Sequence, residues 1–252
     1  MKPPLALQLY TVRELLAQDF IGTMEKIAAI GFVGVETAFF EDISLNRAAQ
    51  VIEDLGLQVP AVHCDIALGD KQKDVLELAE TFNCQRLVWH GWPQDADYSS
   101  VEGVKRLAER YNGANSVARA NGCSFGIHNH WWEFEEVEGT YPYQILLAEM
   151  DESIFFEVDT YWVKVAGSDP AKIVKELGER APLLHLKDGP GKKDEPKLAA
   201  GTGVMDFPTI LQNAEAPEWL IWEMDDCSTD MLVAVEQSYQ YLTEQGLAKG
   251  KV

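Results

Sequence analysis

Eight short apolar runs recur along the chain, and each is followed by a longer segment with helical spacing. The runs are Leu5–Tyr10, Phe32–Glu36, Gln58–His63, Arg86–His90, Ser124–His128, Ile154–Asp159, Leu183–Lys187 and Leu220–Glu223. Short apolar runs without polar alternation are typical of strands that are buried on both faces of a parallel sheet. The pattern therefore predicts eight buried parallel strands.

The segments between the runs carry start and stop signals of helices. One expected helix ends at Ile30 and one begins at Asp169-Pro170; the others are Leu45–Leu55, Lys71–Phe82, Val101–Ala120, Tyr141–Met150, Phe207–Ala214 and Asp230–Gln245. Gly31, Gly56 and Asn83 stop the first three, because glycine and asparagine tolerate the left-handed conformation at helix ends. Ser99–Glu102 predicts a capping box, and Asp169 before Pro170 predicts a cap followed by proline at the first helical position.

Strict alternation of strands and helices predicts a parallel sheet covered by helices. The 252 residues suit a (β/α)8 barrel, which typically has ~250. The alternative is an open doubly wound sheet, which commonly has a glycine-rich turn after its first strand. The turn Tyr10–Arg13 contains no glycine. We therefore expect an α/β protein with a single (β/α)8 TIM barrel domain over residues 1–252.

The charge balance limits the classes of partner. With 21 Lys and Arg against 41 Asp and Glu, the net charge is −20, which argues against nucleic acids and membrane surfaces. No apolar run approaches the ~18 residues of a membrane span, and Met1–Leu16 lacks the features of a secretory signal. Cys64, Cys84, Cys123 and Cys227 show no CxxC spacing, so we expect free, buried thiols in a cytoplasmic protein.

All five histidines lie at or next to the carboxyl end of an expected strand. They are His63, His90, His128, His130 and His185. A single histidine in such a place would more often be an ordinary loop residue. Because barrel active sites are built at the carboxyl ends of the strands, five at one edge predict a functional site.

Carboxylates end three of the same runs. Glu36, Asp159 and Glu223 each follow apolar residues, where an ionised carboxylate is costly unless it meets a cation or hydrogen-bond donors. Asp159, His185 and Glu223 lie on consecutive strands, which favours a shared metal over separate structural pairs. Such a set of oxygen and nitrogen ligands suits Mn²⁺, Mg²⁺ or Co²⁺ and can also hold Zn²⁺.

Other polar and aromatic residues at this edge have two interpretations each. Lys187 shares a strand face with His185, so it either pairs with a carboxylate or holds a substrate oxygen. The loop Gly189–Asp206 is either a solvated charged segment or a mobile lid. The aromatic residues after the fifth and sixth strands either pack together or form walls for a sugar ring; they are Trp131, Trp132, Tyr161 and Trp162.

Six segments taken together resemble the sugar phosphate isomerase/epimerase family of xylose isomerase-like TIM barrels. They are Gln8–Arg13, Gly31–Glu36, His128–Phe134, Glu157–Thr160, His185–Asp188 and Gly201–Phe207. The resemblance extends over essentially the whole chain. It implies one divalent metal held by a Glu, Asp, His, Glu set on the fifth to eighth strands.

Carried over to this chain, the resemblance implies Asp159, His185 and Glu223 as metal ligands. Family epimerases have a glutamate at the end of the fifth strand, where this chain has His128, and Glu133 follows five residues later. We expect Glu133 to reach back to the metal, with His128 as the alternative ligand.

The same resemblance implies roles for the remaining residues. Glu133 and Glu223 would double as acid–base groups, His128 or His130 is the other candidate base, and Lys187 would stabilise negative charge. The residues expected to contact substrate are Gln8, Tyr10, Glu36, His63, His90, Trp132 and Trp162.

The chemistry that fits is removal of a proton next to a carbonyl through an enediolate. We therefore expect a metal-dependent isomerase or epimerase of a small sugar or sugar derivative, with a neutral sugar favoured by the acidic charge. A lyase acting on a keto-sugar or keto-inositol, similar to inosose dehydratases, is the main alternative.

A noncatalytic sugar-binding barrel would have no need of four metal ligands, and the related DNA-repair endonuclease would need a basic footprint. Many such barrels associate in pairs, so a homo-oligomer is compatible with this interpretation.

Overall fold

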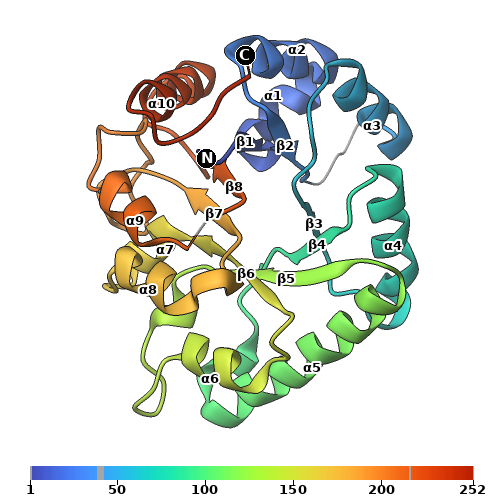
Figure 1. The fold of residues 1–252 in the computed structure, drawn as a ribbon, viewed down its shortest axis with the longest axis vertical. Coiled ribbons are helices and arrows are strands. Elements are labelled where there is room, and N and C mark those ends of the chain that lie inside the picture. Colours follow the sequence, from blue (N-terminus) through green and yellow to red (C-terminus); the bar gives the residue numbers. More distant parts are fainter. Residues whose placement is uncertain (1, 39–42, 216, 252) are drawn as a thin grey trace.

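The eight strands form one parallel sheet that is nearly closed into a barrel (Figure 1). The computed structural model describes residues 2–38, 43–215 and 217–251. The strands are β1 (Leu5–Gln8), β2 (Gly34–Glu36), β3 (Val62–Cys64), β4 (Arg86–Trp89), β5 (Ser124–His128), β6 (Phe155–Asp159), β7 (Leu183–Leu186) and β8 (Trp219–Trp222). Between β2 and β3 the ladder is reduced to the bridges Gly34–Gln58 and Thr37–Val62. The predicted (β/α)8 barrel is confirmed.

Helices surround the strands on the outside (Figure 1). They are α1 (Arg13–Gln18), α2 (Phe20–Ile30), α3 (Leu45–Asp54), α4 (Gln72–Thr81), α5 (Val101–Ala120), α6 (Pro142–Glu149), α7 (Thr160–Val165), α8 (Pro170–Leu177), α9 (Phe207–Asn213) and α10 (Met231–Glu244). The short helices α1 and α7 were not predicted; α7 begins because the Asp159 carboxylate accepts a hydrogen bond from the Trp162 amide. Ser100, rather than Ser99, caps α5, so the predicted capping box with Glu102 is wrong.

The barrel interior changes from apolar to polar along its axis. Side chains two residues apart on a strand point to the same face, so β6 directs Phe155, Glu157 and Asp159 inward at increasing height. The apolar end is a separate buried cluster of Ala6, Ala61, Val88, Phe155, Leu183, Trp219 and Ile221. Gly126 makes room there, because a Cβ at this position would lie 2.3 Å from the Phe155 ring. The polar end therefore lies at the carboxyl ends of the strands.

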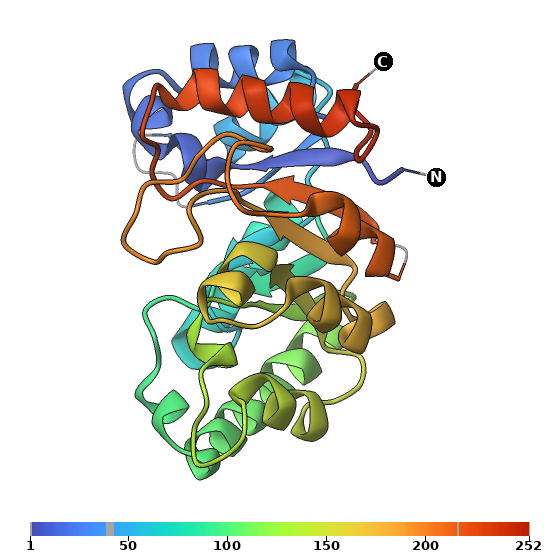
Figure 2. The ribbon, with the colours of Figure 1, turned by 90° about the vertical axis from the view of Figure 1, so that its left-hand side faces the viewer.

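Viewed from the side, the two ends of the barrel carry different parts of the chain (Figure 2). The long loop after β7 extends beyond the strands on the side to which β8 points, and both chain termini lie on the other side. Among the described residues, no helix is both long and apolar enough to cross a membrane. All four cysteines are free, but only Cys64 and Cys84 are buried, while Cys123 and Cys227 are partly exposed.

Candidate active site

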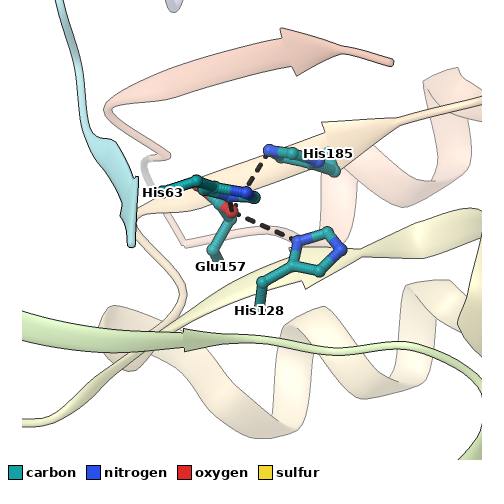
Figure 3. Close-up of side chains that lie close together, drawn as sticks. All are labelled: His63, His128, Glu157 and His185. Carbon is teal, nitrogen blue, oxygen red and sulfur yellow. Dashed lines mark hydrogen bonds and ion pairs between the residues drawn. The ribbon is translucent and has the colours of Figure 1, made fainter. Parts of the chain in front are cut away.

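The deeper polar residues form a cluster around the Glu157 carboxylate, which we call the inner layer (Figure 3). Glu157 Oε2 lies 2.6 Å from His63 Nε2, 3.2 Å from His128 Nδ1 and 3.2 Å from His185 Nε2. Glu36, on β2, adds a second carboxylate, 2.7 Å from His185 Nε2 and within hydrogen-bond distance of the Gln8 amide. The inner layer thus consists of two buried carboxylates and three imidazoles.

Burial and mutual repulsion shape the charges of this layer. Burial, with a further contribution from Glu157, raises the pKa of Glu36 to about 8. Burial also opposes ionisation of Glu157, but His185 and His63 hold the pKa of this carboxyl well below its usual range. Glu36 Oε1 and Glu157 Oε1 are buried and accept no hydrogen bond from the described residues. Near neutral pH Glu36 is therefore largely protonated, and Glu157 is the ionised carboxylate of the layer, with its charge offset by the neighbouring imidazoles.

The second group, which we call the outer layer, lies closer to the barrel mouth and is built around Lys187. Its ammonium lies 3.0 Å from Asp159 Oδ2, 3.1 Å from Glu223 Oε2 and 3.1 Å from Asp225 Oδ2. An ammonium has three N–H donors, and here three carboxylates surround it. Lys187 is also fully buried, so of its two interpretations the structure favours pairing with carboxylates over direct contact with substrate.

Donor atoms of four buried residues from four neighbouring strands converge between the two layers. The potential ligand atoms of His128, Asp159, His185 and Glu223 all lie within 4.8 Å of one another, and so do those of His63, His128, Glu157 and His185. Burial raises the pKa of Asp159 to about 6 even with Lys187 beside it. Crowded buried carboxylates next to imidazole nitrogens are the kind of donor set that divalent cations stabilise. The residues present therefore fit a metal ion.

Glu133, the expected fifth-strand ligand, lies away from both ligand groups. It lies in a single 3₁₀ turn, Trp132–Phe134, and its carboxylate accepts a hydrogen bond of 3.0 Å from the His130 amide. Burial raises the pKa of this carboxyl to about 7, although the Tyr98 hydroxyl also bonds to it. Among the described residues, Glu133 belongs to neither ligand group, whereas His128, the alternative fifth-strand ligand, belongs to both.

A pocket of about 390 Å³ opens over the outer layer at the carboxyl ends of the strands. It is lined by Gln8, Tyr10, Ala38, His63, His90, Trp92, His128, His130, Trp131, Trp162, Lys193, Asp194, Lys197, Glu223, Asp225 and Asp226. Two residues that we expected to contact substrate lie behind this wall. Glu36 is fully buried in the inner layer, and Trp132 is stacked on His130 with their ring centroids 4.4 Å apart. Both support residues that line the pocket.

The loop after β7 is fastened to the barrel at its base. The Asp188 carboxylate accepts hydrogen bonds from the backbone amides of Gly189, Gly201, Gly203 and Met205. Lys197, in the same loop, donates its amide proton to Asp226. Because of these hydrogen bonds, the loop is not a freely solvated charged segment along its whole length.

Lys197 brings a second ammonium to the pocket. It is only 2% exposed, and its Nζ lies 4.9 Å from the centre of the Trp162 ring. The nearest carboxylate oxygens of the described residues, on Asp225 and Asp226, are both 3.8 Å away, which is too far for hydrogen bonds. Unlike Lys187, this ammonium retains donors for a bound molecule.

Several residues of this site were not predicted as functional, among them Glu157, Asp225 and Lys197. Glu157 could have been found, because it precedes Asp159 by two residues, the same spacing that placed Lys187 beside His185. Asp225 and Lys197 follow strands in loops, and no periodicity in the sequence fixes where loop side chains point.

Known proteins share both a family profile and a fold with this chain. A family profile described as xylose isomerase-like TIM barrel matches residues 24–245. A search of the curated proteins returned no relative of this chain. Solved structures with similar folds include a sugar phosphate isomerase/epimerase from Parabacteroides distasonis, with a TM-score of 0.83 and 21% identity over 99% of this chain and 100% of that one.

Two further structures show the range of proteins built on this barrel. An L-ribulose 3-epimerase matches with a TM-score of 0.73 and 16% identity over 97% of this chain and 94% of that chain. The probable 3-DHS dehydratase from Bacillus anthracis also has a TM-score of 0.73, with 14% identity over 96% of this chain and 99% of that one. At these identities the likeness concerns the fold, whereas the family profile covers most of the sequence. The chain belongs to the xylose isomerase-like TIM barrel family.

Proposed function

We propose that this protein is a divalent-metal-dependent isomerase or epimerase of a sugar or sugar derivative. The observation that carries the proposal is the convergence of four buried donors, on His128, Asp159, His185 and Glu223, where two of them line the pocket. A site that only bound sugar would have no use for these donors, because burying carboxylates without a function is costly.

We assign the metal to His128, Asp159, His185 and Glu223. This group brings a carboxylate, Glu223, to the pocket lining, whereas the pocket-lining members of the other group, His63 and His128, are both imidazoles. A divalent cation in this place would act as a Lewis acid that polarises a substrate carbonyl and stabilises the negative charge of an enediolate. The inner layer would orient the ligands, since Glu157 lies beside His128 Nδ1 and Glu36 beside His185 Nε2.

Residues of the chain supply the proton transfers. Glu223 is a pocket carboxylate whose pKa, despite burial, Lys187 and His185 hold well below its usual range, so it is ionised and able to accept a proton. His130, which also lines the pocket, is the second candidate for proton transfer by its position; burial holds its pKa well below that of a free imidazole, so the ring is neutral before substrate binds. Lys197 can donate a hydrogen bond to a substrate oxygen that gains negative charge.

The charges around the pocket favour a neutral substrate over a phosphorylated one. Among the described residues that line the pocket, two ammonium groups, of Lys193 and Lys197, accompany four carboxylates, of Asp194, Glu223, Asp225 and Asp226. Lys187 and a bound divalent cation would offset Glu223 and Asp225, so the described lining keeps no surplus of positive charge to hold a phosphate group. This balance supports a free sugar or a neutral sugar derivative.

A lyase that removes water from a keto-sugar is the second candidate. An epimerase exchanges a proton between the two faces of a carbon, which a pair of carboxylates readily serves. The observation that favours a dehydratase is that β5 ends in a histidine, His128, and not in a carboxylate. A dehydratase needs one base and one acid, which Glu223 and an imidazole could provide.

Deuterium incorporation tests both candidates. The purified protein with Mn²⁺ is incubated in D₂O with free ketoses, keto-inositols, 3-keto glycosides and ketose phosphates. An isomerase or epimerase gives a deuterated isomer of unchanged composition, whereas a dehydratase gives an unsaturated product with a new ultraviolet absorbance. If no substrate in the panel exchanges deuterium, and no divalent cation binds, the proposed function is wrong.

A further inference from the structure

The outer part of the pocket is more aromatic than proton transfer at a single sugar ring requires. The Trp162 ring centre lies 5.0 Å from that of Trp131, and Trp131 lies 6.4 Å from Trp92, so the three pocket indoles form a continuous series. The series begins next to the outer layer, where Lys187 Nζ lies 5.1 Å from the Trp162 ring. It therefore leads from the candidate metal centre to the mouth of the pocket.

Trp92 differs from its aromatic neighbours in exposure. Its residue surface is 55% exposed, whereas Trp162 is 5% and Trp132 is 2% exposed. An exposed indole leaves a large apolar surface in water, which costs free energy in proportion to its area. A ligand that covers this ring would recover that free energy.

Trp92 is nevertheless held in a defined place. Its amide donates a hydrogen bond of 3.1 Å to His90 Nδ1. Its ring lies 5.6 Å from His130 and 5.9 Å from Trp132, measured between ring centres. A flat apolar surface that is already ordered binds with less loss of side-chain entropy than a mobile one.

Polar groups lie beside this aromatic surface. Lys193 Nζ lies 3.7 Å from the centre of the Trp131 ring, and Lys193 and Asp194 both line the pocket. An ammonium and a carboxylate can bond the hydroxyl groups of a sugar whose apolar C–H face rests on an indole. The pocket volume of about 390 Å³ also falls in the range that takes ligands of drug size.

We propose that the substrate is a keto-glycoside, in which the reacting sugar, which carries the ketone, lies over the outer layer and a second ring, sugar or aryl, rests against Trp92. This inference rests on the proposed function for the place of the reacting ring. The second ring needs only the aromatic surface, so it can be tested without turnover.

The test uses probes that lack a carbonyl and do not react. Isothermal titration compares a phenyl glucoside and a methyl cellobioside with the methyl glucoside of the same anomeric configuration, against wild type, Trp92→Ala and Trp92→Phe. Wild type should bind a two-ring probe about tenfold more tightly than the one-ring probe. Trp92→Ala should remove that preference and leave the affinity for the methyl glucoside unchanged, and Trp92→Phe should retain part of it. Ile21→Ala, at an exposed apolar residue on α2, is the matched control that should change nothing.

Three results would overturn the inference: no preference in wild type, a preference that survives Trp92→Ala, or an equal loss for one-ring and two-ring probes. Preference for the phenyl glucoside alone identifies an aryl second ring, and preference for both probes identifies a surface that accepts either. Because no probe reacts, failure of the metal or deuterium experiments would contradict the proposed function without altering this result.

Discussion

Two carboxylates on the same face of β6, only two residues apart, have very different surroundings. Glu157 lies in the inner layer among three imidazoles, whereas Asp159 lies beside a lysine in the outer layer. Neither carboxylate is exposed. The difference is height along the barrel axis: carboxylates of the outer layer, on Glu223 and Asp225, line the pocket, whereas the inner layer contributes only the imidazoles of His63 and His128 to its lining.

One barrel thus holds both carboxylates that orient imidazole rings and carboxylates that could contact a metal. In the inner layer, carboxylates lie beside the nitrogens of His128 and His185 that face away from the proposed metal, so they fix the rings and their protons. In the outer layer, carboxylates can be shared between Lys187 and a divalent cation. Both layers are buried. They differ in the group beside the carboxylates, which is an imidazole in the inner layer and the Lys187 ammonium in the outer layer.

The largest effect should come from Asp159→Asn. The asparagine oxygen can still accept the Trp162 amide that begins α7, but the charge of the ligand is lost. We expect the bound metal, measured by mass spectrometry after dialysis against a chelator, to fall to near zero, and deuterium exchange to fall at least about a thousandfold. Asp225→Asn is the control, because Asp225 also pairs with Lys187 but belongs to neither ligand group. Equal metal retention in the two variants would contradict the assignment.

Glu157→Gln should have a smaller effect that acts through the ligands. The amide cannot offer the imidazoles of His63 and His185 the same charge, so we expect metal affinity to fall about 10- to 100-fold in a competition titration. Glu133→Gln is the matched control in another buried carboxylate, and it should keep metal affinity close to that of wild type. If both variants lose affinity equally, the distinction between the inner layer and an ordinary buried glutamate fails.

Lys197→Met should act on turnover and leave the metal in place. Loss of a charged hydrogen bond to a substrate oxygen should reduce kcat about tenfold, with a smaller change in KM. Lys193→Met, in the same loop, removes an ammonium that stacks on Trp131 and should affect mainly KM. A fall in kcat of the same size in both variants would show that loop charge in general, and not Lys197, is responsible.

The last effect concerns stability, not metal binding or turnover, and isolates Glu133. Its pKa is raised by burial from 4.5 to about 7, so its protonated form favours the folded state. The stabilisation is fully present below pH 4.5 and is lost as the pH rises to about 7, by at most about 1.4 kcal/mol for each pH unit. Urea unfolding of wild type and Glu133→Gln across this range should show the difference in free energy changing in that direction. A difference independent of pH would show that Glu133 remains ionised when folded.

The sequence allowed the barrel and one edge of it to be predicted because both depend on periodicity. Continuous apolar runs identified the strands, and the carboxyl end of each run placed His128, Asp159 and His185 near one another. Glu133 was misplaced because a single 3₁₀ turn directs its side chain toward the His130 amide, and sequence spacing does not encode such a turn. Lys197 was given no specific role because its place depends on a loop contact that spacing does not encode, the hydrogen bond from its backbone amide to the Asp226 carboxylate.

The anchoring of the β7 loop by Asp188 has a consequence for how this barrel could change its specificity. Four amides close to the two ends of the loop converge on one carboxylate, and the segment between them, 190–200, includes two of the lysines that line the pocket. Loops tolerate insertion and exchange far better than strands do. Residues 190–200 can thus be exchanged while the hydrogen bonds to Asp188 hold the two ends of the loop in place. Such an exchange would change the contacts to substrate and leave the proposed metal ligands unchanged.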